Sequence, residues 1–317
     1  MRKEVAKVTG AARTADAPGR GSDRASVGAL LVYALAVAFV VAAPVLRRLY
    51  LPPGSRYQAG TAANSHLSDA AAVDELVIAP PFHTSQPERT PHISRTWGIV
   101  GGVGVNVVTV NPKAENVKVV LGLAQGTVLS QNRFGREDFG PMVRRLKPRV
   151  AINGTYFNLR NNEPVGALVM EGRLIYDGLS SGVLMVSEEG QVWIEYHQGK
   201  FGRNLGWARN IRTAVGAGPM LLQSGKVALR PRDEGFGDPS LFALARRSAV
   251  GVTAEGKLLL VTVETPISLN KLAFIMLRLG AVNAMALDGG GSTALYSNGQ
   301  FISLPGRPLT NLILVYD

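Results

Sequence analysis

The stretch AVNAMALDGGGSTALYSNGQFISL, residues 281–304, carries three structural signals in a row. AVNAMALD is apolar at nearly every position, which is typical of a strand buried on both faces. Three glycines follow Asp288, although glycine is costly in ordered structure because it loses the most backbone freedom on folding. Asn298–Gly299 then predicts a tight turn between two further strands. The stretch therefore predicts a strand, a glycine loop and a hairpin, with an acid where strand and loop meet.

The segment before this stretch predicts the clearest helix of the chain. Ser268 is a good N-cap, and Gly280 is a typical stop signal. Apolar residues recur on one helical face between them. These residues are Leu269, Leu272, Ala273, Met276 and Leu279.

Short apolar runs separated by glycines extend back to about residue 93, and most of them predict strands or hairpins. The runs are 104–110, 116–124, 149–157, 166–178, 182–196, 218–229, 246–264 and, after the opening stretch, 309–316. Residues 139–148 predict a second helix, which ends at Pro148. The expected fold class is α+β, with a large mixed β-sheet and few helices.

The N-terminal part has a different organisation. Residues 27–46, VGALLVYALAVAFVVAAPVL, contain no charge and are long enough to cross a bilayer as a helix. Basic residues are concentrated before this run, which predicts a cytoplasmic N-terminus and an exported remainder. A cleaved signal peptide and a buried core helix are the alternatives. The predicted organisation is a cytoplasmic basic tail (1–26), a single-pass membrane anchor (27–46), a proline-rich flexible linker (47–92) and an extracytoplasmic domain (93–317).

Composition limits the classes of function. Hydrophobic residues make up 46% of the 317 residues, enough for a packed core, and the formal charge is +11. The basic excess is shared by the tail and the exported domain. It suits anionic substrates or a negatively charged envelope surface, and the alternative is a basic surface without a specific partner. Basic and aromatic residues are not interleaved in a pattern that would indicate nucleic-acid binding. Cysteine is absent, which excludes disulfides, thiolate metal sites and a thiol nucleophile. The oligomeric state is not predicted.

The glycine loop is the first candidate site. A glycine turn after a strand directs backbone N–H groups at an anion, and Gly289, Gly290 and Gly291 form such a turn beside the Asp288 carboxylate. Ser292 adds a hydroxyl donor. The alternative is a tight turn in which Asp288 caps its own backbone. The loop is not a phosphate-binding P-loop, because it lacks the lysine and a strand follows it.

Two other segments contain groups suited to sugars and anions. AINGTYFN, residues 151–158, ends a predicted strand and offers Asn153, Gly154, Tyr156 and Asn158. RRSAVGV, residues 246–252, places Arg247 at the head of an apolar strand, and the planar guanidinium of arginine suits oxyanions.

Together these segments resemble the phosphodiester glycosidase family, which has exported bacterial relatives. The family pattern contains an Asn-Gly-aromatic strand end, an Arg-[Ser/Thr]-Ala-[Val/Ile]-Gly strand, a helix and a Leu-Asp-Gly-Gly-Gly-Ser loop. The chain has INGTYFN (152–158), RSAVG (247–251), SLNKLAFIMLRLGAVNA (268–284) and LDGGGST (287–293) in that order. The departures are Thr155–Tyr156 in place of Gly-Phe, Thr293 in place of a second serine, and VET (263–265) in place of an acid-glycine pair.

The resemblance implies hydrolysis of a sugar–phosphate bond in a glycan or sugar-phosphate substrate. It assigns catalytic roles to Asp288, Arg247 and Asn153. The implied substrate-binding residues are Gly154, Tyr156, Asn158, Gly289, Gly290, Gly291, Ser292 and Glu264. Asp288 would act as nucleophile, base or electrostatic stabiliser. Glu264, Glu163 and Asp177 are alternatives for a second carboxylate.

Two other functions stay open. The same cleft could bind envelope glycans without catalysis. Asp288 and neighbouring oxygens could also hold a divalent cation such as Ca²⁺ or Mg²⁺, although acids close to Asp288 in sequence are lacking. The enzyme reading itself requires no cofactor.

Overall fold

A computed structural model describes residues 92–202 and 210–317 of the chain. The predicted tail (1–26), anchor (27–46) and nearly all of the linker (47–92) lie outside the described residues. Within the described part, no helix is both long and apolar enough to span a membrane.

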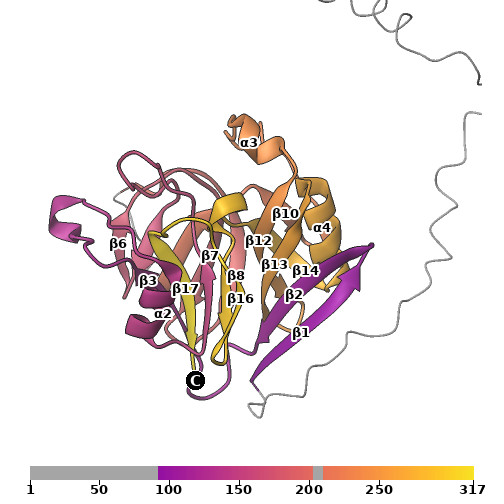
Figure 1. The fold of residues 1–317 in the computed structure, drawn as a ribbon, viewed down its shortest axis with the longest axis horizontal. Coiled ribbons are helices and arrows are strands. Elements are labelled where there is room, and N and C mark those ends of the chain that lie inside the picture. Colours follow the sequence, from indigo (N-terminus) through magenta and orange to yellow (C-terminus); the bar gives the residue numbers. More distant parts are fainter. Residues whose placement is uncertain (1–91, 203–209) are drawn as a thin grey trace, which may run out of the picture. The chain divides into compact units, whose positions relative to one another are not determined.

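The largest sheet has seven strands in the order β1-β2-β13-β12-β14-β10-β11 (Figure 1). It contains the glycine-loop strand β14 near its centre, which explains why that strand is almost entirely apolar. The bounds are β1 Ile93–Val100, β2 Val103–Val110, β10 Met220–Gln223, β11 Lys226–Val227, β12 Ala245–Thr253, β13 Leu258–Ile267 and β14 Ala281–Ala286.

Two five-stranded sheets complete the β-structure of the described residues, in the orders β16-β15-β4-β17-β3 and β6-β5-β9-β7-β8. Strands of the first are β3 Lys118–Leu123, β4 Val150–Asn153, β15 Leu295–Ser297, β16 Gln300–Ser303 and β17 Asn311–Tyr316. Strands of the second are β5 Leu168–Met170, β6 Arg173–Tyr176, β7 Ser180–Ser187, β8 Val192–Gly199 and β9 Ile211–Ala217.

The prediction of one large mixed sheet was wrong in two respects. The strands divide among three sheets, and every pair of named strands in the described residues is antiparallel. Helix α4 (Leu269–Arg278) connects β13 to β14, but β12 lies between these strands and pairs with both. β13 and β14 therefore run parallel to each other but are not neighbours in the sheet. The α+β class itself is confirmed, with few helices beside many strands.

A central hydrophobic core is shared by all three sheets. Leu260 from the seven-stranded sheet, Ile152 from the second sheet and Leu184 from the third all belong to it and are fully buried. The outer face of the seven-stranded sheet packs against α4, and the outer face of the second sheet packs against α2 (Phe139–Leu146) (Figure 1). The elements around the site are thus fixed from both sides by apolar packing.

Local signals in the sequence are confirmed by the structure. The Ser268 hydroxyl accepts a hydrogen bond from the Lys271 N–H at the start of α4, and Gly280 follows the helix with a positive φ of 84°. Asn298 and Gly299 also have positive φ, as the predicted turn between β15 and β16 requires. The elements that the sequence analysis missed are β1, β9 and the short helices α3 (Pro239–Phe242), η1 (Leu129–Gln131) and η3 (Gly290–Ser292).

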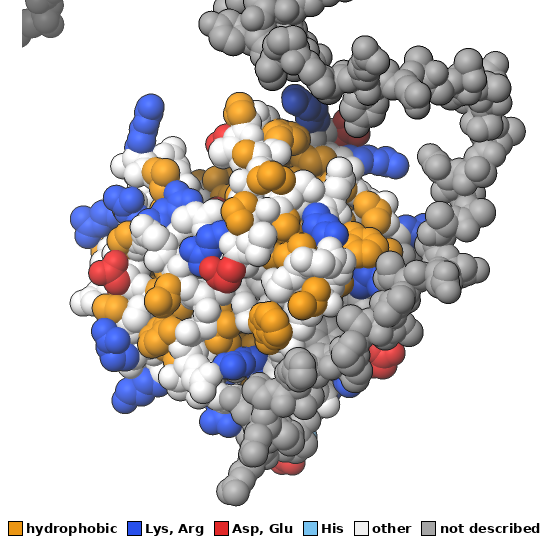
Figure 2. All heavy atoms as spheres, turned by 45° about the vertical axis from the view of Figure 1, so that its right-hand side comes forward, with side chains coloured by type: hydrophobic (Ala, Val, Ile, Leu, Met, Phe, Trp, Pro, Cys, Tyr) orange, Lys and Arg blue, Asp and Glu red, His pale blue; other side chains and the backbone are white. Residues whose placement is uncertain are grey.

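The basic balance of the sequence is visible on the surface. Figure 2 shows Lys and Arg side chains at several places around one face, with fewer Asp and Glu side chains between them. Such a surface favours the approach of anionic molecules.

Candidate active site

Asp288 lies where β14 has ended and three segments meet. The Leu287 N–H donates to the Ser248 carbonyl on β12 at 2.9 Å, and the Asp288 N–H donates to the Gly154 carbonyl after β4 at 3.2 Å. The position of Asp288 is thus set by two different sheets.

Asn153 is the side chain that joins these segments. It is 1% exposed, and its Nδ2 donates to the Asp288 carbonyl at 2.6 Å. Its Oδ1 accepts from Ser248 Oγ at 2.8 Å and from the Ala294 N–H at 3.0 Å. The amide therefore holds β4, β12 and both ends of the glycine loop together. Its predicted contact with substrate stays a prediction.

The three glycines are needed for different reasons. A Cβ at Gly289 would lie 2.9 Å from the Arg246 carbonyl, so this residue must be bare for the loop to approach β12. Gly290 has φ of +56°, a backbone conformation that side chains disfavour, and no atom lies within 4 Å of its Cβ position. A Cβ at Gly291 would lie 3.1 Å from Arg307 Nε. The loop is therefore enclosed by β12 on one side and by an arginine on another.

The Ser292 and Thr293 N–H groups donate to Gly289 and Gly290 carbonyls within the turn. Those two amides are therefore occupied. Since the Gly289 N–H acts on the Asp288 carboxyl, the predicted anion nest rests on the N–H groups of Gly290 and Gly291.

The Asp288 carboxyl has an unusual protonation equilibrium. Burial raises its pKa from the ordinary 3.8 to about 6, because a low-polarity environment disfavours the charged form. The Ser292 hydroxyl opposes this rise most, followed by the positive charge of Arg307 and the Gly289 N–H. A carboxyl that titrates close to neutral pH is typical of catalytic sites.

Tyr156 lies close enough to Asp288 and Arg247 to interact electrostatically with both. Burial raises the pKa of its phenol, the Asp288 carboxylate raises it further, and Arg247 lowers it. The hydroxyl donates to the Gly218 carbonyl at 2.8 Å. Tyr156 therefore stays protonated at neutral pH.

Arg247 lies beside the loop, but its guanidinium donates hydrogen bonds to backbone carbonyls of the protein itself. It is 4% exposed. Its Nε donates to the Ile267 carbonyl at 3.1 Å, and its Nη2 donates to the carbonyls of Leu241 and Ala243 at 2.9 and 2.6 Å. Burial lowers the pKa of Arg247, but arginine remains charged at neutral pH. Three of its hydrogen bonds therefore stabilise the local fold, and its predicted binding of an oxyanion stays a prediction.

Buried polar atoms without hydrogen bonds are concentrated around Asp288. Ten such atoms occur in the described residues, and four of them belong to the loop and its two flanking arginines: Arg246 Nε, Ser292 Oγ, Thr293 Oγ1 and Arg307 Nε. The Ser292 hydroxyl also lies close enough to the Asp288 carboxyl to lower its pKa. Since buried polar groups are nearly always paired, this concentration indicates a place where a ligand or water supplies the missing partners.

The remaining predicted residues have other partners in the structure. Asn158 is exposed, and its Oδ1 accepts from the Arg160 N–H within its own loop. Gly154 is buried where a Cβ would overlap with Asn311 Oδ1, so its absence of a side chain serves packing. Their predicted contacts with substrate are not tested by these positions.

The alternatives for a second carboxylate are likewise paired elsewhere. Glu264 Oε2 forms an ion pair with Arg246 Nη2 at 2.6 Å, and Glu163 accepts from the Asn161 amide. Asp177 accepts from the backbone N–H groups of Phe201 and Gly202. Across residues 92–202 and 210–317, no three His, Asp or Glu side chains gather closely enough to hold a metal ion.

Arg307 is a site residue that sequence reasoning missed. It lies over Gly291 and influences the Asp288 carboxyl. The available signal was the segment PGRP, residues 305–308, in which prolines on both sides restrict the backbone around a glycine and a cation.

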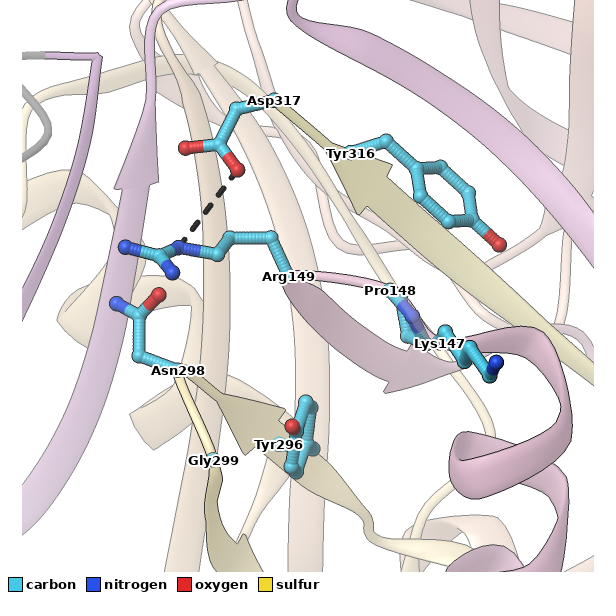
Figure 3. Close-up of a pocket in the computed structure, with 8 residues that line it drawn as sticks. All are labelled: Lys147, Pro148, Arg149, Tyr296, Asn298, Gly299, Tyr316 and Asp317. Atoms are coloured by element: carbon cyan, nitrogen blue, oxygen red, sulfur yellow. Dashed lines mark ion pairs between the residues drawn. The ribbon is translucent and has the colours of Figure 1, made fainter.

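A pocket at the other end of β4 does not belong to this site. It is lined by Lys147, Arg149, Tyr296, Asn298 and Asp317, among others (Figure 3). Asn153 is at one end of β4, whereas Arg149 precedes the other end. Arg149 Nε faces Asp317 Oδ1 at 3.6 Å across this pocket (Figure 3). Asp288, Asn153 and Arg247, for which the sequence predicts catalytic roles, lie at the other end.

Comparison with solved structures identifies similar folds. A hypothetical protein from Synechocystis is 20% identical with a TM-score of 0.59, over 75% of this chain and 64% of that protein. The catalytic domain of zebrafish N-acetylglucosamine-1-phosphodiester alpha-N-acetylglucosaminidase, auto-inhibited by its pro-peptide, is 20% identical with a TM-score of 0.61, over 74% of this chain and 86% of that one. The chain thus spans less than two thirds of the Synechocystis protein. At this identity the likenesses show the fold.

Comparison with curated protein sequences finds no match. The sequence profile of the phosphodiester glycosidase family matches residues 147–316, which is more than half of the chain and includes β4, β12, α4 and the glycine loop. The chain belongs to the phosphodiester glycosidase family.

Proposed function

We propose that this protein hydrolyses the bond between a sugar and a phosphodiester, with Asp288 as the reacting carboxylate. Family membership supports a glycosidase-type hydrolase. The observation that carries the proposal is the Asp288 carboxyl, with a pKa of about 6, next to buried hydroxyl and guanidinium groups that lack partners.

The chemistry suits a site with one prominent carboxylate. Breaking the anomeric C–O bond develops positive charge on the sugar and negative charge on the departing phosphate. The ionised Asp288 would stabilise the sugar cation, by direct attack on the anomeric carbon, by activating water or by charge alone. A phosphate is a better leaving group than an alcohol, so the reaction depends less on a general acid. Hydrogen-bond donors around the loop would stabilise the phosphate as its charge increases.

The sugar would bind beside Tyr156, whose ring and half-buried position suit contact with a pyranose face. The Tyr156 hydroxyl is already used on Gly218, so its contribution would come from the ring. Asn153 would keep the carboxylate in place, since it holds the Asp288 backbone.

Envelope glycans are the proposed source of the substrate. The proposal combines the apolar run at residues 27–46 as a single-pass anchor, an extracytoplasmic catalytic domain and a net positive charge that favours anionic polymers. Alkaline extraction of membranes tests the anchor: the full chain is expected to stay in the membrane fraction. If N-terminal sequencing shows that the mature protein begins near residue 44, the segment is instead a cleaved signal peptide.

The decisive experiment compares the purified full chain with Asp288→Asn on a panel of glycosyl phosphodiesters. Release of free sugar and phosphomonoester is measured. The substitution is expected to lower kcat/KM on the order of 10²–10⁴-fold, as for other acid–base groups. Asp233→Asn, in an exposed turn, is the matched control and is expected to leave activity unchanged.

Other outcomes would favour the alternative functions. Binding of the glycans without turnover, with the same affinity in Asp288→Asn, would indicate a binding module. Loss of activity in excess chelator, restored by Ca²⁺ or Mg²⁺, would indicate a cation-dependent site. We expect activity that is unchanged by chelator, because the described carboxylates near Asp288 do not form a metal-binding cluster.

A further inference from the structure

Arg307 is attached to the glycine loop through its own backbone. The Gly306 N–H donates to the Gly291 carbonyl at 2.8 Å, and Pro305 and Pro308 restrict the segment on either side. The guanidinium lies over Gly291, with Nε 3.1 Å and Nη2 3.4 Å from the position that a Cβ would occupy there. A Cβ at residue 291 would crowd the guanidinium, which would have to shift slightly.

The Arg307 guanidinium has unused donors. Its Nε is buried and donates to no acceptor in the described part of the chain. Four ion pairs occur among the described residues, and Arg307 belongs to none of them. Its guanidinium contacts the ring of Phe157, whose centroid lies 6.0 Å from Cζ. Buried guanidinium donors are normally satisfied, so an acceptor from outside the protein is the natural partner.

The two neighbouring arginines differ in this respect. Arg247 is committed to three backbone carbonyls. Arg246 pairs with Glu264 and also donates to the Leu304 carbonyl. Arg307 is therefore the arginine of this group that forms neither a hydrogen bond nor an ion pair with the described residues.

The surroundings of Arg307 connect it to the reacting carboxyl and to free space. Its positive charge lowers the pKa of Asp288, so the two groups interact. It also lines an open pocket together with Phe139, Leu304, Pro305 and Asp138. An anion on Arg307 would thus lie near Asp288 and beside a pocket with room for an attached group.

We propose that Arg307 binds the phosphate of the substrate, that Gly291 is a glycine to admit its guanidinium, and that the pocket beside it receives the group beyond the phosphate. This assignment rests on the proposed function. The planar fork of arginine can donate two parallel hydrogen bonds to phosphate oxygens, which a point charge cannot. Because negative charge on the phosphate grows as the sugar departs, the interaction strengthens in the transition state.

Inorganic phosphate tests the site without any turnover. Calorimetric titration of the full chain is expected to show binding that weakens roughly tenfold or more in Arg307→Gln and less in Arg307→Lys, which keeps the charge but loses the fork. Arg278→Gln, at the exposed end of α4, is the matched control and is expected to bind like the unaltered chain. No phosphate binding by the unaltered chain, or equal affinity in Arg307→Gln, would overturn the assignment.

Kinetics separate this inference from the proposed function. Arg307→Gln is expected to lower kcat/KM for a glycosyl phosphodiester about 100-fold, with a much smaller effect on an uncharged aryl glycoside of the same sugar. An equal loss on both substrates would mean that Arg307 acts on the fold and not on phosphate. If the unaltered chain cleaves no phosphodiester, the proposed function fails, while the phosphate titration still decides the role of Arg307.

Discussion

Asp288 shows how a single residue can carry opposing constraints. Its backbone is fixed by Gly154, Asn153 and the end of β14, whereas its carboxyl lies in surroundings that favour the neutral form. The partial compensation by Ser292 and Arg307 leaves the pKa at about 6. Small changes around this group will therefore alter its charge near neutral pH.

The pH dependence of activity follows from this pKa. All three proposed roles of Asp288 require the ionised form, so kcat/KM for a glycosyl phosphodiester is expected to rise as pH increases through about 6. Arg307→Gln removes a positive charge that lowers this pKa. The rise of kcat/KM with pH should therefore occur at higher pH in the variant. A pH–rate profile of both proteins checks this, and a flat profile across that region would contradict the role of Asp288.

The same pKa makes a prediction about stability. Because the folded-state pKa lies above the ordinary 3.8, protonated Asp288 stabilises the fold below about pH 3.8, and this contribution is lost as pH rises through about 6. A shift of this size corresponds to at most about 3 kcal/mol. Asp288→Asn, which stays neutral, is expected to unfold at higher urea concentration than the unaltered chain at pH 7, with the difference disappearing in acid. Asp233→Asn should show no such pH-dependent difference.

At the scale of elements, the end of β4 and the glycine loop use glycine in different ways. Gly154 is enclosed, with Asn311 Oδ1 in the space of a Cβ and accepting from the Thr155 N–H. Gly290 has open space around it but a left-handed backbone. Close packing governs the first position, and backbone conformation governs the second.

These two glycines should respond differently to alanine. Gly154→Ala is expected to cost more than about 3 kcal/mol of unfolding free energy, because the methyl group displaces the Asn311 amide. Gly290→Ala should cost roughly 1–2 kcal/mol, the penalty of a left-handed conformation. Urea unfolding measures both, and equal effects would show that the two positions are not distinguished by packing.

At the scale of the whole described domain, sheets meet around one central core, and buried polar pairs connect them. Thr262 on β13 of the seven-stranded sheet and Ser303 on β16 of the second sheet form a buried hydroxyl pair at 2.7 Å. Both side chains are at most 1% exposed. This pair lies within the same contact between sheets that brings β12 and β4 to the site.

A double-mutant cycle tests that connection. Thr262→Val is expected to cost about 1–3 kcal/mol, because the Ser303 hydroxyl is left buried without its partner. Adding Ser303→Ala should recover part of the loss, since no polar group then remains unpaired. Strictly additive losses in urea unfolding would contradict a direct interaction between the two hydroxyls.

The sequence by itself determined the features that depend on near neighbours. The N-cap at Ser268, the stop at Gly280, the Asn298–Gly299 turn and the apolar strand before Asp288 all follow from interactions within a few residues. The motif order also predicted the family that the profile comparison shows. Predictions of the tail, anchor and linker lie outside the described residues and stay predictions.

Only the tertiary structure decided how distant residues combine. Apolar alternation indicates that a strand is buried, but it does not indicate which strand becomes its neighbour. The division into three antiparallel sheets was therefore not predicted. Asn153 hydrogen-bonds to Asp288, which is 135 positions away in the sequence. Arg247 donates its hydrogen bonds to backbone carbonyls that no local sequence pattern identifies. Arg307 gained its place beside Asp288 because the loop after β16 folds back onto Gly291. Packing between elements, not the preference of any one segment, sets these contacts.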